Sequence, residues 1–127
     1  MRRVREDGGQ STVELALVLP FVCLVVLAVV QVGLVIHAHL LVVHAAREGA
    51  RAAAVDEHPM AARIAVVAGT PLDAEHVTVT SRDAGERVEV EVQYRYSTDV
   101  PLIGSLVGDV DLSATAVMRR EYGSVEE

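Results

Sequence analysis

Near its N-terminus the chain carries an apolar segment with the length of a membrane span. From Leu15 to Ile36 the only strongly polar side chain is that of Gln31, and only Pro20 and Gly33 weaken a helix. The segment covers about 22 residues, which exceeds the roughly 18 that mark a membrane-spanning helix. We therefore predict a transmembrane helix over residues 10–36.

The helix is expected to continue beyond the membrane. Residues 38–55 are rich in alanine, the best helix former, but they also carry charge. Ser11 or Thr12 is a suitable N-cap for a helix that begins near Val13. A helix of this extent would measure on the order of 65–70 Å, roughly twice the thickness of the membrane core. Residues 37–57 are therefore predicted to project from the membrane.

The projecting half needs a partner for its apolar face. The residues at three- and four-residue steps along it are Leu40, Val43, Arg47, Ala50 and Ala54. We expect this face to pack on the domain that follows.

The remaining chain predicts a small antiparallel sheet. Apolar and polar residues alternate over residues 76–80 and 87–96, and a turn signal lies between them at 83–85. A third strand is predicted at 109–120, after a glycine-punctuated apolar connection at 101–108 that has room for one helical turn. One face of these strands is apolar, and the projecting half of the helix is available to cover it.

A short helix is expected between the long helix and the sheet. His58-Pro59 ends the long helix, and Gly69-Thr70-Pro71 ends the short one, which covers about residues 59–68. Its apolar face would be formed by Met60, Ile64 and Val67. The predicted fold is thus α+β: a long N-terminal helix packed on an antiparallel sheet of about three strands. The predicted segments are a leader at 1–9, the membrane helix at 10–36, the projecting helix at 37–57, the α+β domain at 58–120 and a tail at 121–127.

Charge sets the expected orientation and excludes one class of partner. Arg2, Arg3 and Arg5 precede the apolar segment, which places the N-terminus in the cytoplasm by the positive-inside rule. The formal net charge is −7 at pH 7, and most of the acidic residues lie in the C-terminal half. An acidic domain does not fit a nucleic-acid-binding surface.

The residue pattern offers no catalytic or metal site. Cys23 is the only cysteine, so no intrachain disulfide is possible, and it lies inside the apolar segment as a small hydrophobe. His37, His39 and His44 form no convincing ligand set with an Asp, Glu or Cys one turn away, and the H-E-x-x-H pattern is absent, so we interpret them as polar residues near the membrane surface. Glu89 and Glu91 alternate with valines and belong to the solvated face of a strand. We expect no enzymatic activity and no cofactor.

A glycine and a carboxylate mark the entrance of the apolar segment. The sequence from Gly9 to Pro20 reads GQSTVELALVLP, and Glu14 stands five positions after the glycine. A carboxylate in a bilayer costs roughly 2.5 kcal/mol or more, which makes it a functional candidate. With Gln31, Gly33 and the AAREGARAAA segment at 45–54, this sequence resembles the TadE-like family of minor pseudopilins from tight-adherence (Flp-type) pilus systems. The resemblance covers about residues 8–55.

The resemblance implies a pilin-like fold and processing by a membrane prepilin peptidase after Gly9. Gln10 would then be the first mature residue, and Glu14 the fifth, where it sets the register of packed subunits. The implied partners are the prepilin peptidase, other pilins and minor pseudopilins, the inner-membrane pilus assembly platform and the lipid bilayer. The C-terminal domain is larger than that of a typical major pilin of these systems, so a minor subunit is favoured. The implied location is the cell membrane, as a single-pass protein with an extracytoplasmic domain.

Each of these signals has a plainer interpretation. Glu14 fits an interfacial residue stabilised by the helix dipole, and the glycines before it fit a flexible linker. Pro20 fits a kink with or without a role. Gln31 and Gly33 fit either a helix–helix contact or exposure to lipid. The alternative function is an uncleaved single-span protein whose domain binds a ligand or regulates a membrane partner; a membrane-tethered enzyme is a third option without a visible reactive site.

Overall fold

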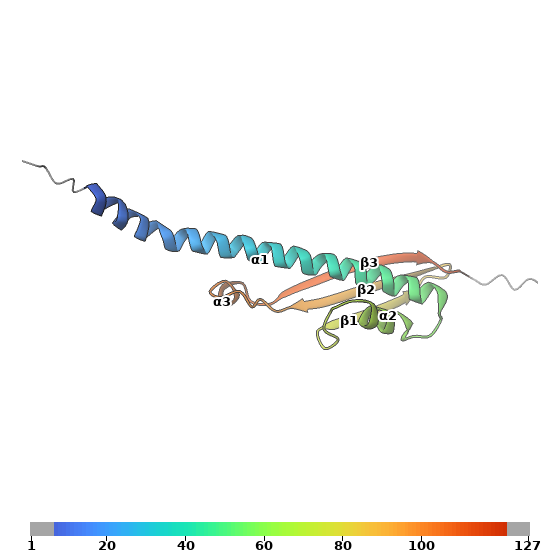
Figure 1. The fold of residues 1–127 in the computed structure, drawn as a ribbon. Coiled ribbons are helices and arrows are strands. Elements are labelled where there is room, and N and C mark those ends of the chain that lie inside the picture. The colour runs from blue at the N-terminus through green and yellow to red at the C-terminus, as the bar shows by residue number, and fades with distance from the viewer. Residues whose placement is uncertain (1–6, 122–127) are drawn as a thin grey trace, which may run out of the picture.

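A long helix lies across one face of a small sheet, with the N-terminal half of the helix extending beyond the domain (Figure 1). The structure is a computed structural model that describes residues 7–121. The arginines of the leader and most of the predicted tail lie outside these residues. The fold is α+β, as predicted, and its elements are α1 (Asp7–Val55), α2 (Ala61–Gly69), β1 (Val77–Asp83), β2 (Arg87–Tyr96), α3 (Gly104–Val107) and β3 (Val110–Arg119).

The first helix begins earlier than the sequence predicted. α1 already includes Asp7 and runs for 49 residues, about 73 Å, to Val55. The prediction of a start near Val13 is wrong, because no proline precedes that point and a glycine costs a helix only about 1 kcal/mol. α1 also continues through Pro20 without interruption. The last residues of the predicted leader are thus part of the helix.

The sheet has the simplest antiparallel order, β1-β2-β3. Val92 in the central strand lies opposite Val79 of β1 and Ala114 of β3, and Val90 lies opposite Ala116 of β3. Side chains alternate between the two faces of a strand, so this register places the apolar residues of all three strands on one face. β2 has the bounds that the alternation predicted, whereas β1 extends three residues further than expected, to Asp83.

Small residues of α1 form the contact with the sheet. The buried face of the helix consists of Ala38, Val42, Ala45, Ala46, Gly49, Ala50, Ala53 and Ala54. The predicted face is therefore wrong for Leu40, which is 56% exposed, and for Arg47, which is also exposed; of the predicted residues only Ala50 and Ala54 are buried. Alanine and glycine are selected because they allow the helix backbone to approach the sheet closely.

The second helix also presents the opposite face to the one predicted. Ala61, Ala62 and Val66 are buried, whereas Met60 and Ile64 are exposed at 46% and 61%. α2 packs beside α1, and again small side chains make the contact. The larger apolar residues of α2 are left on the surface.

Arg120 joins three parts of the domain at the end of the sheet. Its guanidinium contacts Glu57, which follows α1, at 3.3 Å and Asp83 at the end of β1 at 2.8 Å. The arginine side chain is only 16% exposed, while both carboxylates are largely open to solvent. A backbone hydrogen bond from Glu121 N–H to the carbonyl of Ala54 holds the same end of the domain together.

We expect Arg120→Met to lower the free energy of unfolding by about 1–3 kcal/mol, because hydrogen bonds to charged partners are lost from a mostly buried site. Arg119→Met is the matched control, since Arg119 pairs with Glu86 and both side chains are about 80% exposed; an exposed pair contributes ~0–1 kcal/mol. Thermal unfolding of the two variants measures the difference. Equal losses at both positions would contradict a stabilising role specific to Arg120.

Candidate functional site on the N-terminal helix

The first half of α1 exposes a continuous apolar surface. α1 is long and apolar enough to cross a membrane, and its most apolar window is not buried by any other described part of the chain. Large side chains such as Leu17, Phe21 and Val25 are all more than half exposed. Exposing an apolar surface of this extent to water is energetically unfavourable, so the segment requires a membrane or a protein partner. Its single cysteine, Cys23, is a free thiol on the same exposed segment.

The predicted cleavage and register residues share one face at the start of this surface. Gly9, Gln10, Val13, Glu14 and Leu17 line a shallow open depression on one side of α1. Gly9, Gln10 and Glu14 are all exposed. The spacing of four residues from Gln10 to Glu14 is about one helical turn, so the two positions are neighbours on the helix surface.

The Gly9–Gln10 bond lies in the least restrained part of the helix. α1 begins at Asp7, so this bond belongs to its first turn, where backbone N–H groups lack the acceptor four residues earlier. Glycine also weakens the helix locally. A Cβ placed on Gly9 would meet no atom within 4 Å. The bond is therefore accessible, and opening the first turn around it requires little free energy.

Glu14 is an exposed carboxylate directly before the apolar segment that begins at Leu15. It forms no ion pair with any of the residues that the structure describes. Because α1 begins at Asp7, Glu14 lies about two turns from the helix start, beyond the first turn in which the helix dipole stabilises an anion. A charged carboxylate against lipid is costly, so a cation from another molecule would be favourable here.

Pro20 and Gly33 face away from the domain. Pro20 is exposed within α1, and a Cβ on Gly33 would have open space around it. Gly33 makes no close contact with the sheet domain, so its surface is open to lipid or to another helix. The predicted packing role of these two residues stays a prediction.

Gln31 is not exposed to lipid. Its side chain is 4% exposed, and its Nε2 donates a hydrogen bond to Thr98 Oγ1 at 3.2 Å. Its Oε1 is buried and has no hydrogen-bond partner among the residues described. The expectation of a lipid-facing or helix–helix role overlooked the polypeptide after β2, which returns to α1 at this position. In the sequence, the only signal of this contact is a single amide side chain, Gln31, within an otherwise apolar segment. Its partner Thr98 lies far along the chain.

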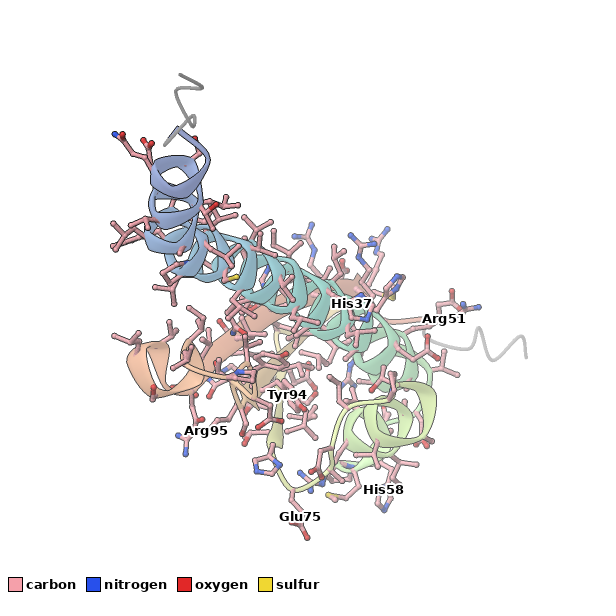
Figure 2. The ribbon with its side chains drawn as sticks, turned by 60° about the vertical axis from the view of Figure 1, so that its left-hand side comes forward. His37, Arg51, His58, Glu75, Tyr94 and Arg95 are labelled. Atoms are coloured by element: carbon pink, nitrogen blue, oxygen red, sulfur yellow. The ribbon has the colours of Figure 1, made fainter. Side chains whose placement is uncertain are left out.

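The outer face of the sheet is polar, and several of its charged side chains form ion pairs. Glu89 and Glu91 lie there as predicted, each 3.9 Å from Arg82. Figure 2 shows Glu75 and Arg95 pointing away from α1. They line a shallow polar hollow in which Arg95 contacts Asp111 at 3.2 Å.

The turn beside this hollow is fixed by Asp73. The backbone N–H of Glu75 donates to its carboxylate at 3.0 Å, and His76 Nδ1 lies at the same distance. These contacts, with the backbone hydrogen bond first, lower the pKa of Asp73. His37, His39 and His44 are exposed along α1. Within residues 7–121 no three His, Cys, Asp or Glu side chains gather as a metal site would require.

A comparison with known families matches the segment that contains Gly9, Gln10 and Glu14. The model of the family described as TadE-like protein matches residues 9–51, about a third of the chain, and this confirms the resemblance seen in the sequence. No curated protein and no solved structure matches the chain significantly. The family match and the apolar N-terminal helix fit a single-pass membrane protein related to Tad pili.

Proposed function

We propose that this chain, TadE-like over residues 9–51, is a minor pseudopilin that takes part in the assembly of a tight-adherence type IV pilus. In this proposal a prepilin peptidase cleaves after Gly9 on the cytoplasmic side, and the C-terminal domain lies on the other side of the membrane. The observation that carries the proposal is the placement of Gly9, Gln10 and Glu14 on one exposed face at the entrance of an unburied apolar helix.

Cleavage would create the partner that Glu14 lacks. Hydrolysis of the Gly9–Gln10 bond gives Gln10 a free α-amine four residues before the carboxylate. In a bundle of such helices, the amine of one subunit pairs with Glu14 of another subunit. The pairing compensates the cost of a carboxylate near lipid and fixes the axial register of the subunits. Hence the chain acts by helix bundling, and the exposed side of α1 is the bundling surface.

The domain gives each subunit a bulky extracytoplasmic part. The sheet and α2 pack against the second half of α1, so the domain and the long helix form one structural unit. We assign the chain to the minor subunits, which initiate, cap or assist assembly, because its C-terminal domain is larger than that expected of a major pilin of these systems. Its partners in this role are the peptidase, other pilins and minor pseudopilins, and the inner-membrane assembly platform.

We expect Glu14→Ala to abolish or strongly reduce pilus assembly while membrane insertion is retained or improved, because the variant removes a charge from the bilayer entrance. Glu14→Gln keeps the shape without the charge and should fail in the same way. Glu75→Ala, an exposed carboxylate of the domain, is the control and should assemble normally. Counting surface pili and co-purifying pilus proteins in the three strains tests the proposal. Wild-type assembly in both Glu14 variants would show that the carboxylate has no role in register.

A further inference from the structure

The segment between β2 and β3 carries an exposed apolar tip. We define residues 97–109, which include α3, as the α3 loop; Leu102, Leu106 and Val107 are exposed at 65%, 80% and 54%. No charged residue lies between Asp99 and Asp109. We propose that the α3 loop dips into the lipid surface beside α1 and gives the domain a second membrane contact. The proposal goes beyond pilus assembly and rests only on the membrane insertion of α1.

The loop is held near the outer end of the apolar segment of α1. Thr98, at its start, accepts the hydrogen bond from Gln31. The apolar segment from Leu15 to Ile36 is about 33 Å of helix, close to the thickness of the hydrocarbon core, and Gln31 lies five residues before its outer end. Figure 1 shows α3 at the end of the domain that is nearest to the N-terminal half of α1. The tip therefore lies next to the bilayer surface and not at a distant point of the domain.

Contacts within the domain hold the α3 loop in a defined conformation. A Cβ on Gly104 would collide with the carbonyl oxygen of Thr98, so α3 packs closely on the residue that contacts α1. Leu102 has φ 66°, which makes it the one non-glycine residue of the described chain in the left-handed region. Such a backbone is unfavourable for leucine and persists only where its surroundings hold it. The exposed side chains are thus presented by a defined structure.

The backbone of the tip is suited to an apolar environment. N–H groups near lipid need protein acceptors, because hydrocarbon offers none. Within the loop, Gly104 donates to the carbonyl of Val100 at 2.8 Å, Val107 to that of Ile103 at 2.9 Å and Gly108 to that of Gly104 at 3.0 Å. Ser105 Oγ donates to the carbonyl of Leu102 at 2.9 Å. These hydrogen bonds satisfy several of the loop's polar groups within the loop, while Leu102, Leu106 and Val107 are exposed.

Lipid is the occupant that the position favours. The loop contacts α1 through Thr98 at Gln31, and α1 exposes apolar residues around this point, among them Val30 and Val32. The apolar surface of the span thus continues onto the loop, as an interfacial membrane contact requires. Met60, which caps α2, and Ile64 within α2 are also exposed and have no such connection with the span, so they serve as a comparison.

The chain contains no tryptophan, so a single introduced tryptophan reports on its own surroundings. We would prepare Leu106→Trp, Ile64→Trp and Leu24→Trp in the full chain, in liposomes of phosphatidylethanolamine and phosphatidylglycerol with brominated acyl chains. We expect the bromines to quench most of the emission from positions 106 and 24 and little from position 64. Aqueous iodide should show the opposite order. Val107→Trp provides a second reporter if Leu106→Trp perturbs the loop.

The possible outcomes separate the loop from the anchor. Quenching by lipid at positions 24 and 106 in nanodiscs that hold one chain each supports the proposal. Quenching at position 24 with iodide-accessible tryptophans at 106 and 107 overturns it and leaves α1 in the membrane. Protection of position 106 only in liposomes with many chains assigns the tip to a second copy and also overturns it. A lack of lipid quenching at position 24 would remove the anchor and the loop proposal together.

Discussion

Gly49→Val is expected to lower the free energy of unfolding of the domain by about 3 kcal/mol, because overpacking a tight core typically costs about 1–3 kcal/mol and valine adds a branched side chain to a helix. A Cβ at this position lies 3.0 Å from Val66 Cγ2, 3.1 Å from Val90 Cγ1 and 3.5 Å from the carbonyl oxygen of Ala62. Val66 and Val90 are fully buried, so neither side chain has space into which to move. The glycine is thus the point where α1, α2 and the central strand meet.

Gly33→Val in the same helix is the matched control, because a Cβ there has no neighbour within 4 Å. In a domain of 60–100 residues a loss of 1 kcal/mol lowers Tm by roughly 4–8 °C, so the Gly49 variant should melt at least 10 °C below the wild type by about the same conversion. Circular dichroism of the two variants in the same detergent gives the comparison. If the variants melt together, the close contact at Gly49 does not determine the stability of the domain.

Gly9→Leu is expected to stop removal of the leader almost completely. A leucine side chain at the scissile bond obstructs the close backbone approach that glycine permits to a protease. The structure has open space around Gly9, and leucine favours a helix more than glycine does, so the variant should fold and insert normally. A block in processing would therefore report on recognition by the peptidase and not on misfolding.

Gly8→Leu is the control, since it changes the neighbouring glycine and leaves the scissile bond as Gly9–Gln10. We expect this variant to be processed, and the two proteins to differ by the nine leader residues on intact mass measurement. Normal processing of Gly9→Leu would mean that the glycine does not define a cleavage site. Pili should be missing wherever the leader is retained.

The strands were predictable because the alternation of apolar and polar residues fits only one choice of buried face. The valines and glutamates of residues 88–92 alternate strictly, and a shift by one residue would place the glutamates in the core. The bounds of β2 and the face of Val88, Val90 and Val92 followed directly. The apolar length of α1 was equally clear, since it depends on the number of apolar residues and not on their phase.

The helix faces were not predictable, because α1 and α2 are apolar around most of their circumference. Around Leu40 and Arg47 the sequence offers alanines on several sides, and hydrophobicity alone favoured the larger side chains. Close packing favoured the smaller ones, such as Ala46 and Gly49, since the sheet lies directly against the helix backbone. When a helix contacts a sheet closely, its small residues are buried and its larger apolar residues are left exposed, which is the opposite of what hydrophobicity alone predicts.

The candidate site also has a part that the sequence predicted and a part that only the structure shows. Gly9, Gln10 and Glu14 were recognisable because their spacing in the sequence is their spacing on one helix. The contact of Gln31 with Thr98 joins residues 67 positions apart, and no local pattern predicts it. The α3 loop was recognised as an apolar connection, but its place beside the end of the span follows only from the packed domain.

The N-terminal residue of the protein recovered from membranes tests the proposed function most directly. Intact mass and terminal-peptide analysis would be performed on protein from cells with and without the prepilin peptidase. We predict a start at Gln10 only when the peptidase is present. A start at Met1 or Arg2 in both strains would contradict the pseudopilin assignment and would leave an uncleaved single-span protein.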